Sequence, residues 1–142
     1  MGGRGTFAAG KNVDYTYEVD RSIYPDGKIE GIKILKALPG ATNHGLPASA
    51  HSSEAYIKLY SDGTFQQMNF YDKDHCLYLE IDYHYEYGIS RYRTEKVLHY
   101  HTYDKSFSMD KNAPNSRSDA KKLTRDMYNQ YAKYLKGAVF YD

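Results

Sequence analysis

The chain has 142 residues, 41% of them hydrophobic, and its 19 Lys and Arg side chains nearly balance its 18 Asp and Glu side chains. This length favours one domain with a single core, and the balanced charge excludes the strong overall positive field that nucleic-acid-binding proteins commonly carry. The only cysteine, Cys76, excludes an internal disulfide and a cysteine-based zinc site.

The N-terminal segment 1–12 contains four glycines and no hydrophobic periodicity. We therefore expect it to be flexible, and we expect residues 13–142 to form a single α+β domain. The sequence has no apolar stretch that resembles a signal peptide and no run of about 18 apolar residues. We expect no membrane association, and the single cysteine suits a reducing compartment.

The first part of the chain predicts short strands and a long loop. Residues 15–19 alternate weakly between apolar and polar side chains, and a Pro-Asp-Gly turn over 24–28 leads into a predicted strand over 28–35. Gly31 would permit a bulge inside that strand. The segment 36–53 is rich in glycine, proline and small polar residues, which predicts a long loop.

The middle of the chain predicts an antiparallel meander. Asp62-Gly63 separates two alternating segments, which is a strong hairpin signal. A second turn over 72–75 leads into a third alternating segment, and a basic and aromatic connection over 86–94 leads into a fourth. The predicted strands cover residues 54–61, 64–72, 76–85 and 95–104.

The last part of the chain predicts a polar loop over 108–117 and then an amphipathic helix. Apolar side chains recur with a helical period at Leu123, Met127, Tyr131, Tyr134 and Leu135. Thr124 is placed to cap the helix, and Gly137 to end it. The predicted fold class is α+β, with an antiparallel four- to five-stranded meander sheet and a C-terminal helix packed on one face.

Two polar motifs in neighbouring predicted strands form the candidate site. In IDYHY, Asp82 and His84 share one face of the strand, because successive side chains of a strand point to opposite faces. In VLHYHTYD, His99 and His101 share a face for the same reason. If the two strands pair, one carboxylate and three imidazoles converge.

One chemistry that suits these residues is acid–base catalysis. His99 and His101 would give and take protons near neutral pH, as metal-independent cleavage of RNA requires, and Asp82 would orient a histidine. Arg91 or Arg93, on the connection between the strands, would hold the phosphate. This mechanism needs no cofactor.

The same residues also suit a metal site. Asp82, His84, His99 and His101 would supply ligands for zinc, nickel or iron. A third interpretation is an ordinary polar sheet face on which Asp82 orients a histidine. The D-x-H and H-x-H spacings are only moderately specific, so the residues leave these interpretations open.

Four segments carry a resemblance: MGGRG at the start, FYDKDHCLYLEIDYHY, LHYHTYD and LTRDMYNQYAKYLKG. They are similar to a group of small proteins and C-terminal domains encoded among the head-morphogenesis genes of phages and prophages of Gram-positive bacteria. The likeness covers residues 1–5 and roughly 54–137. Some phage-borne domains of this shape are similar to the ribonuclease superfamily that includes barnase, colicin ribonuclease domains and mRNA-interferase toxins.

The resemblance implies a helix on a four-stranded antiparallel sheet, with histidines and basic residues acting on RNA. His99 and His101 match the paired-histidine positions of the group. Asp82 and His84 match its I-D-x-x-H strand in part, because the spacing here is D-x-H.

The leading hypothesis is therefore a prophage-derived domain that acts on nucleic acid, with RNA as its partner. One alternative is a non-catalytic module that contacts phage head proteins, and another is a metal-binding domain. The predicted location is the cytoplasm or the virion.

Overall fold

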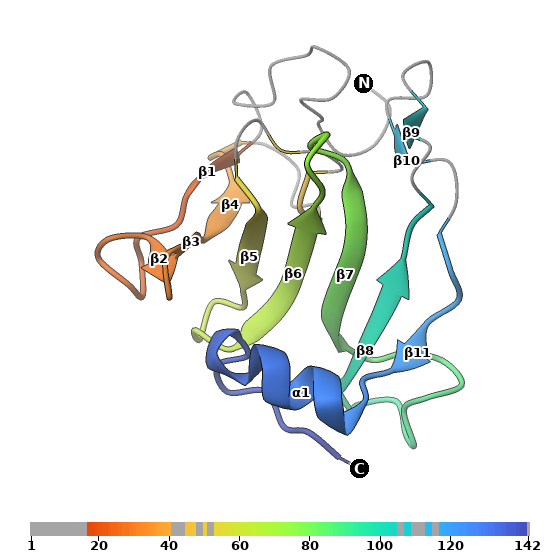
Figure 1. Cartoon of the computed structure of the whole chain (residues 1–142). Coiled ribbons are helices and arrows are strands. Elements are labelled where there is room, and N and C mark those ends of the chain that lie inside the picture. Colours follow the sequence, from red (N-terminus) through yellow and green to blue (C-terminus); the bar gives the residue numbers. More distant parts are fainter. Residues whose placement is uncertain are drawn as a thin grey trace.

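The computed structural model describes residues 17–40, 45–47, 50, 53–104, 107–108, 113–114 and 117–141. Its centre is a five-stranded antiparallel sheet with the strand order β11-β8-β7-β6-β5 (Figure 1). The five strands are β5 (Ala55–Leu59), β6 (Phe65–Tyr71), β7 (Leu77–His84), β8 (Val97–Thr102) and β11 (Lys121–Lys122). This sheet and a short C-terminal helix confirm the α+β class, and β5 to β8 follow one another as the predicted meander.

The predicted Asp62-Gly63 turn joins β5 to β6. Gly63 has a φ of 90°, a conformation that glycine adopts without steric cost. The Asp62 carboxylate accepts a hydrogen bond from the Thr64 N–H at 2.9 Å, which holds the turn in place. The turn closes the hairpin in which Lys58 lies opposite Gln67.

The segment 28–35, predicted to be one strand, contains a tight turn. It holds β2 and β3, which pair with each other, and the start of β4, which pairs with β1. The prediction of a continuous strand was wrong, because Glu30 and Gly31 have φ angles of 49° and 82° and reverse the chain between β2 and β3. The four strands are β1 (Tyr17–Val19), β2 (Lys28–Ile29), β3 (Ile32–Lys33) and β4 (Leu35–Ala37).

Two other predicted segments are described only in part or not at all. The predicted loop 108–117 contains one short strand and overlaps another, β9 (Phe107–Ser108) and β10 (Ala113–Pro114), which pair with each other. The expectation of a loop without strands was therefore wrong there. Residues 1–12, predicted to be flexible, lie outside the described residues.

The predicted helix begins where expected but is short. It consists of α1 (Arg125–Tyr131), which a single 3-10 turn over Ala132–Tyr134 extends. Thr124 caps it, because its hydroxyl oxygen accepts a hydrogen bond from the Met127 N–H at 3.1 Å. Gly137, with a φ of 79°, follows the last turn. None of the described helices is long and apolar enough to cross a membrane.

One face of the central sheet, called the apolar face below, carries the main hydrophobic core. Its side chains come from β5 to β8 and include Ala55, Ile57, Leu59, Phe65, Met68, Ile81, Tyr83 and Leu98. They alternate along the strands except between Phe65 and Met68, where the register of β6 with β5 shifts by one residue. Met127, Tyr128 and Tyr131 are partly buried against this core, where α1 crosses the sheet in Figure 1. Burial of this apolar area is the main favourable contribution to folding here.

The opposite face, called the polar face below, carries two rows of polar side chains that run across the strands. Directly opposed positions place Lys58, Gln67, Asp82 and His99 in one row, and Tyr56, Asn69, Glu80 and His101 in the other. All of these except Gln67 are buried. Buried polar groups cost free energy unless they are hydrogen-bonded or ion-paired. The partners of these side chains therefore decide whether their burial destabilises the fold.

The segment 45–47, within the predicted loop 36–53, lies against the polar face. The Leu46 N–H donates a hydrogen bond to Gln67 Oε1 at 2.8 Å. The Pro47 carbonyl oxygen accepts hydrogen bonds from the Tyr71 hydroxyl at 2.6 Å and from Asn69 Nδ2 at 3.4 Å. This part of the loop therefore covers β6 and satisfies polar groups there.

Candidate functional site

The pairing of β7 with β8 brings the four predicted site residues together. They are Asp82, His84, His99 and His101, called the Asp–His cluster below. Asp82 lies directly opposite His99, and side-chain alternation puts the other two histidines on the same face. The Asp82 Oδ2 atom is 3.8 Å from His101 Nε2 and 4.0 Å from the Nε2 atoms of His84 and His99. One carboxylate oxygen thus faces three imidazole nitrogens.

The second nitrogen of each histidine ring fixes its tautomer. In all three rings Nδ1 contacts a backbone carbonyl oxygen: His84 with Tyr85 at 2.5 Å, His99 with Val97 at 2.8 Å, and His101 with Ser118 at 2.9 Å. A carbonyl oxygen can only accept a hydrogen bond, so Nδ1 carries the hydrogen. In the neutral rings, the lone pair on Nε2 therefore points toward the carboxylate.

Burial makes this arrangement of acceptors costly. Asp82, His99 and His101 are 1%, 0% and 5% exposed. Among the described residues, Asp82 Oδ2 and the Nε2 atoms of His99 and His101 have no hydrogen-bond partner. Burial lowers the pKa of His99 to about 4. It also raises the pKa of Asp82 well above its usual range, and the nearby Glu80 carboxyl adds to that rise.

The buried histidines do not favour the predicted acid–base chemistry. With a pKa of about 4, His99 is neutral at pH 7 and has no proton to donate to a leaving group. Its side chain is 0% exposed, and that of His101 is 7% exposed, so neither ring offers a phosphodiester a direct approach. The Nε2 lone pairs are better placed to bind a cation than to exchange protons with RNA.

Glu80 is a polar-face residue that the sequence analysis did not single out. Its Oε1 accepts a hydrogen bond from the Tyr103 hydroxyl at 2.5 Å. Its Oε2 accepts from Gln67 Nε2 at 3.1 Å and from an Arg117 nitrogen at 3.4 Å. The alternation of β7 could have revealed it, because Glu80 precedes Asp82 by two residues. Glu80 is thus well supplied with donors, whereas Oδ2 of Asp82 has no hydrogen-bond partner among the described residues.

Two further charged residues flank the cluster. Arg117 lies 4.0 Å from Asp82 Oδ2, and its side chain is 51% exposed. A single antiparallel β-bridge between the backbones of Tyr103 and Arg117 brings Arg117 close to Asp82. No local sequence signal predicts such a pairing. Glu86, just after β7, places its Oε1 3.3 Å from His99 Nε2, and its side chain is 27% exposed.

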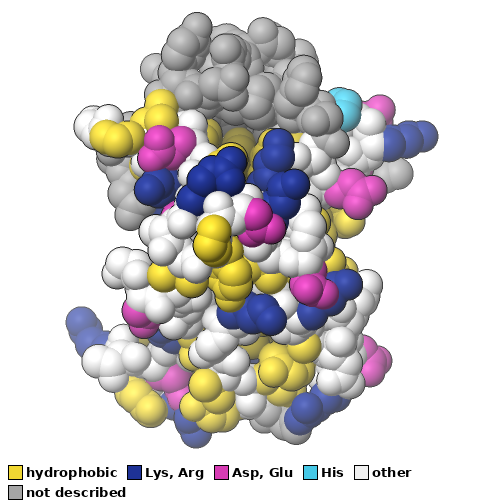
Figure 2. Space-filling view, turned by 90° about the vertical axis from the view of Figure 1, so that its left-hand side faces the viewer, with side chains coloured by type: hydrophobic (Ala, Val, Ile, Leu, Met, Phe, Trp, Pro, Cys, Tyr) yellow, Lys and Arg dark blue, Asp and Glu magenta, His cyan; other side chains and the backbone are white. Residues whose placement is uncertain are grey.

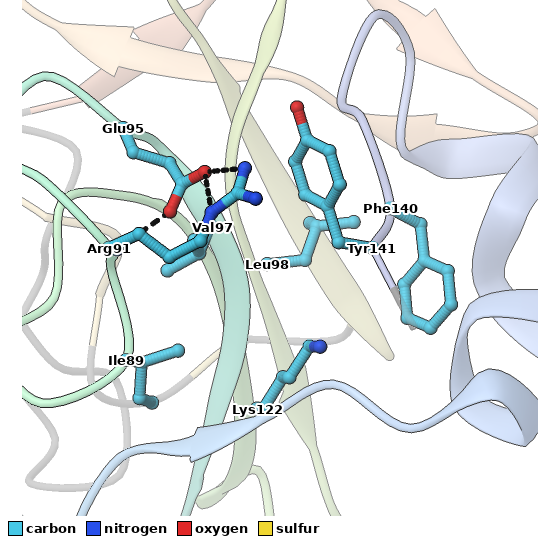
Figure 3. Close-up of a pocket in the computed structure, with 8 residues that line it drawn as sticks. All are labelled: Ile89, Arg91, Glu95, Val97, Leu98, Lys122, Phe140 and Tyr141. Carbon is cyan, nitrogen blue, oxygen red and sulfur yellow. Dashed lines mark hydrogen bonds and ion pairs between the residues drawn. The ribbon is translucent and has the colours of Figure 1, made fainter.

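Of the two predicted phosphate contacts, Arg91 forms an ion pair with Glu95. The Arg91 side chain donates two hydrogen bonds to Glu95 Oε2, and its guanidinium lies 5.0 Å from the centre of the Tyr141 ring. Figure 3 shows this ion pair beside a pocket that Leu98, from the apolar face, also lines. Arg93 is exposed on the same connection. The structure therefore directs Arg91 toward Glu95 rather than toward the Asp–His cluster.

The surface over β1 to β4 gives no electrostatic reason for RNA binding. Figure 2 shows this side of the molecule, on which basic, acidic and hydrophobic side chains are interspersed among the described residues. Proteins that bind nucleic acid usually gather Lys and Arg into a patch or stripe. This surface does not have that pattern.

No protein-family model, no curated protein and no solved structure matches the chain. The resemblance to phage head-region proteins and to the ribonuclease superfamily stays a prediction. The geometry of the Asp–His cluster is therefore the basis on which the function is argued.

Proposed function

We propose that the protein binds one divalent transition-metal ion, with zinc as the best-suited ion, at the Asp–His cluster. Asp82 Oδ2, His99 Nε2 and His101 Nε2 are the buried ligands, and these atoms all lie within 4.8 Å of one another. His84 Nε2 is the fourth ligand, 4.0 Å from Asp82 Oδ2. The observation that carries the proposal is the convergence of these acceptor atoms.

The backbone partners of the three histidines support this assignment. A metal-bound histidine usually donates its other N–H to a carbonyl or carboxylate oxygen, which fixes the ring and its tautomer. Each ring of the cluster makes that contact through Nδ1. The rings are therefore oriented for coordination through Nε2.

A cation satisfies the cluster better than a water molecule does. A water molecule donates two hydrogen bonds, so two of the four acceptors would stay without a donor, at a cost of about 1–3 kcal/mol each when buried. A divalent cation accepts a lone pair from all four atoms. It also offsets the negative charge of Asp82, which burial otherwise disfavours.

The distances fit a metal centre after a small inward movement. Bonds of about 2.0–2.2 Å in a tetrahedral zinc site place neighbouring ligand atoms roughly 3.4 Å apart. The distances from Asp82 Oδ2 to the three Nε2 atoms are 3.8–4.0 Å. Asp82, His99 and His101 offer ligand atoms that all lie within 4.8 Å of one another, whereas His84 groups with His99 and Glu86, so His84 has to move closer to the other ligands. Imidazole and carboxylate ligands without a thiolate suit zinc, iron or nickel.

The other hypotheses have less support. RNA cleavage by His99 and His101 needs an accessible proton donor, and both rings are buried, whereas the His84 side chain is 45% exposed. An ordinary polar face gives no reason for several lone pairs to converge on one buried carboxylate oxygen. RNA and phage head proteins stay predicted partners, and the cytoplasm and the virion stay predicted locations.

Titration of the untagged, chelator-treated protein with Zn²⁺ tests the proposal. We expect calorimetry to show one zinc ion bound per chain. His99→Ala and His101→Ala should raise the dissociation constant by at least about 100-fold, because losing a ligand costs more than losing an outer partner of a ligand. Asp82→Asn keeps the shape of the side chain and removes its charge, so it should weaken binding while circular dichroism stays native.

His75→Asn provides the matched control. His75 is exposed on the turn before β7, with a φ of 67° that asparagine tolerates. This variant should bind zinc with native affinity. A native protein that binds no zinc at micromolar concentrations, or cluster variants that bind as well as the control, would contradict the proposal.

A further inference from the structure

A second group of metal-ligating side chains overlaps the Asp–His cluster and is more exposed. It consists of His84, Glu86 and His99, called the outer triad below, whose ligand atoms all lie within 4.8 Å of one another. The side chains of Glu86 and His84 are 27% and 45% exposed, whereas those of Asp82 and His101 are 2% and 7% exposed. An ion in solvent therefore has direct access to the outer triad but not to the buried ligands.

Within the outer triad, Glu86 faces a lone pair of His99. The distance from Glu86 Oε1 to His99 Nε2 is 3.3 Å. The hydrogen of this ring is on Nδ1, which donates to the Val97 carbonyl at 2.8 Å, so Nε2 of the neutral ring is an acceptor. His99 Nε2 is also buried and has no hydrogen-bond partner among the described residues. A cation between the two acceptors would satisfy both of them.

The turn after β7 holds the backbone of Glu86 in place. The Glu86 N–H donates to Ser90 Oγ at 2.9 Å, and the Glu86 carbonyl accepts from the N–H groups of Ile89 and Ser90 at 3.1 and 2.8 Å. These bonds do not involve the carboxylate. A change of Glu86 to glutamine therefore keeps the turn and removes only the charge that faces His99.

The outer triad and the buried ligands cannot hold two ions at once. His99 belongs to both groups, and its Nε2 has a single lone pair. His84 is shared as well, because it is the proposed fourth ligand of the metal centre. An ion that moves inward therefore keeps His84 and His99. It exchanges Glu86 and one water molecule for Asp82 and His101, so four ligands surround it before and after the move.

The charges beside the cluster favour approach from the side of Glu86. The carboxylate of Glu86 attracts a divalent cation, whereas the Arg117 side chain, 4.0 Å from Asp82 Oδ2, repels a cation that passes it. The competing route is a pocket of about 260 Å³, which Asp82 and His84 line. The two routes differ in whether the ion meets Glu86.

We propose that the outer triad is the entry site of the metal, where a partly hydrated divalent ion binds His84, Glu86 and His99 before it passes to Asp82 and His101. This inference rests on the metal centre proposed above. Entry through the triad lets the ion gain protein ligands while it still keeps a water molecule. Glu86 then controls how fast the ion binds and leaves, and the buried ligands control how tightly it is held.

Stopped-flow absorbance of Co²⁺ binding tests the inference, because the visible bands of Co²⁺ report its coordination. Release is measured by transfer to EDTA, at concentrations where the rate no longer depends on the chelator. Glu86→Gln should slow association and release by the same factor, about tenfold, and keep the dissociation constant within about twofold of the native value. Both rates change together because the ion crosses the entry site in both directions.

Glu54→Gln provides the matched control, because it removes one exposed carboxylate just before β5. This variant should keep the native rates. His101→Ala adds a test at equilibrium, since an ion that lacks this buried ligand stays at the outer triad. In the His101→Ala background, Glu86→Gln should raise the Co²⁺ dissociation constant by at least about tenfold, unlike in the native background.

Three outcomes overturn the entry site and leave the metal centre standing. Native rates in Glu86→Gln would direct the ion through the pocket that Asp82 and His84 line. Faster release with a higher dissociation constant would make Glu86 a stabiliser of the final complex. Equal Co²⁺ affinity of His101→Ala with and without Glu86→Gln would show that the triad holds no ion. A native protein that binds no Co²⁺ overturns both proposals.

Discussion

Ile81 and Asp82 are neighbours in β7, are 0% and 1% exposed, and point to opposite faces of the central sheet. Ile81 packs in the same core cluster as Met68 and Leu98 on the apolar face. Burial is favourable there, by about 25 cal/mol for each Å² of apolar surface. Asp82 faces three imidazole acceptors, where burial costs free energy unless a partner is bound. Equal burial thus has opposite energetic consequences on the two faces.

The polar face itself divides into two regions. Toward β6, Gln67 is hydrogen-bonded to Leu46 and to Glu80, and Asn69 donates to the Pro47 carbonyl, although Asn69 Oδ1 is buried without a hydrogen-bond partner among the described residues. Toward β8, Asp82 and the histidines place acceptors against acceptors. The second region differs because several unpartnered acceptors lie close to one carboxylate oxygen, and this is where we propose a metal ion.

The largest expected effect is on the apolar face. Phe65 is 0% exposed in the core cluster, and Phe65→Ala should lower the free energy of unfolding by about 3–5 kcal/mol through lost burial and a cavity. Urea denaturation measures this change. The loss should be the same with chelator and with zinc, since Phe65 does not face the cluster. If zinc restored the free energy of unfolding lost in Phe65→Ala, the apolar face would not be independent of the proposed metal site.

The next effect concerns the polar face alone. Zinc at 100 times its dissociation constant should stabilise the native protein by about 2.7 kcal/mol, because it binds the folded chain. The melting temperature measures this effect, with and without chelator. His101→Ala should lose the response, and Mg²⁺, which prefers oxygen ligands, should not reproduce it. Equal stabilisation of native protein and variant would remove the reason for treating the polar face as a binding site.

The sequence could predict the elements whose signals are local. Alternation, the Asp62-Gly63 turn and the Thr124 cap each depend on a few adjacent residues, and β5 to β8 and the start of α1 agree with them. The break at Glu30 could not be read from the pattern, because a non-glycine residue with positive φ has no sequence signature. The two-residue strand β11 is defined by its pairing with β8 rather than by its own pattern.

In the candidate site, too, some features follow from local sequence signals and others depend on contacts distant in the sequence. Period-two alternation was enough to place Asp82, His99 and His101 on one face. Their burial could not be predicted, because it depends on contacts distant in the sequence, such as that between His101 and the Ser118 carbonyl. The approach of Arg117 depends likewise on its bridge to the chain after β8. Distant contacts therefore decide that Asp82, His99 and His101 are buried, which is why we propose metal binding rather than acid–base catalysis there.

Glu95 can be compared with Asp82, because it is another buried carboxylate, 6% exposed, and it forms an ion pair with Arg91. Hydrogen bonds from Arg91 lower the pKa of Glu95, whereas burial raises that of Asp82. As the pH falls, the unfolded chain takes up a proton at Glu95 near pH 4.3, while the folded protein is still ionised. The ion pair therefore stabilises the fold above that pH, and this contribution is lost as the pH falls through the lower pKa of the folded state.

We expect the smallest effect from Glu95→Gln, because the Arg91 side chain is 65% exposed and solvent screens the pair. In chelator, the variant should have a lower urea midpoint than the native protein at pH 7, and the difference should shrink toward pH 3. Asp119→Asn, at an exposed position, should show no such pH dependence. If the Glu95→Gln difference is independent of pH, the charge of the pair is not what stabilises this carboxylate. The contrast with Asp82 would then rest on packing rather than on a charged partner.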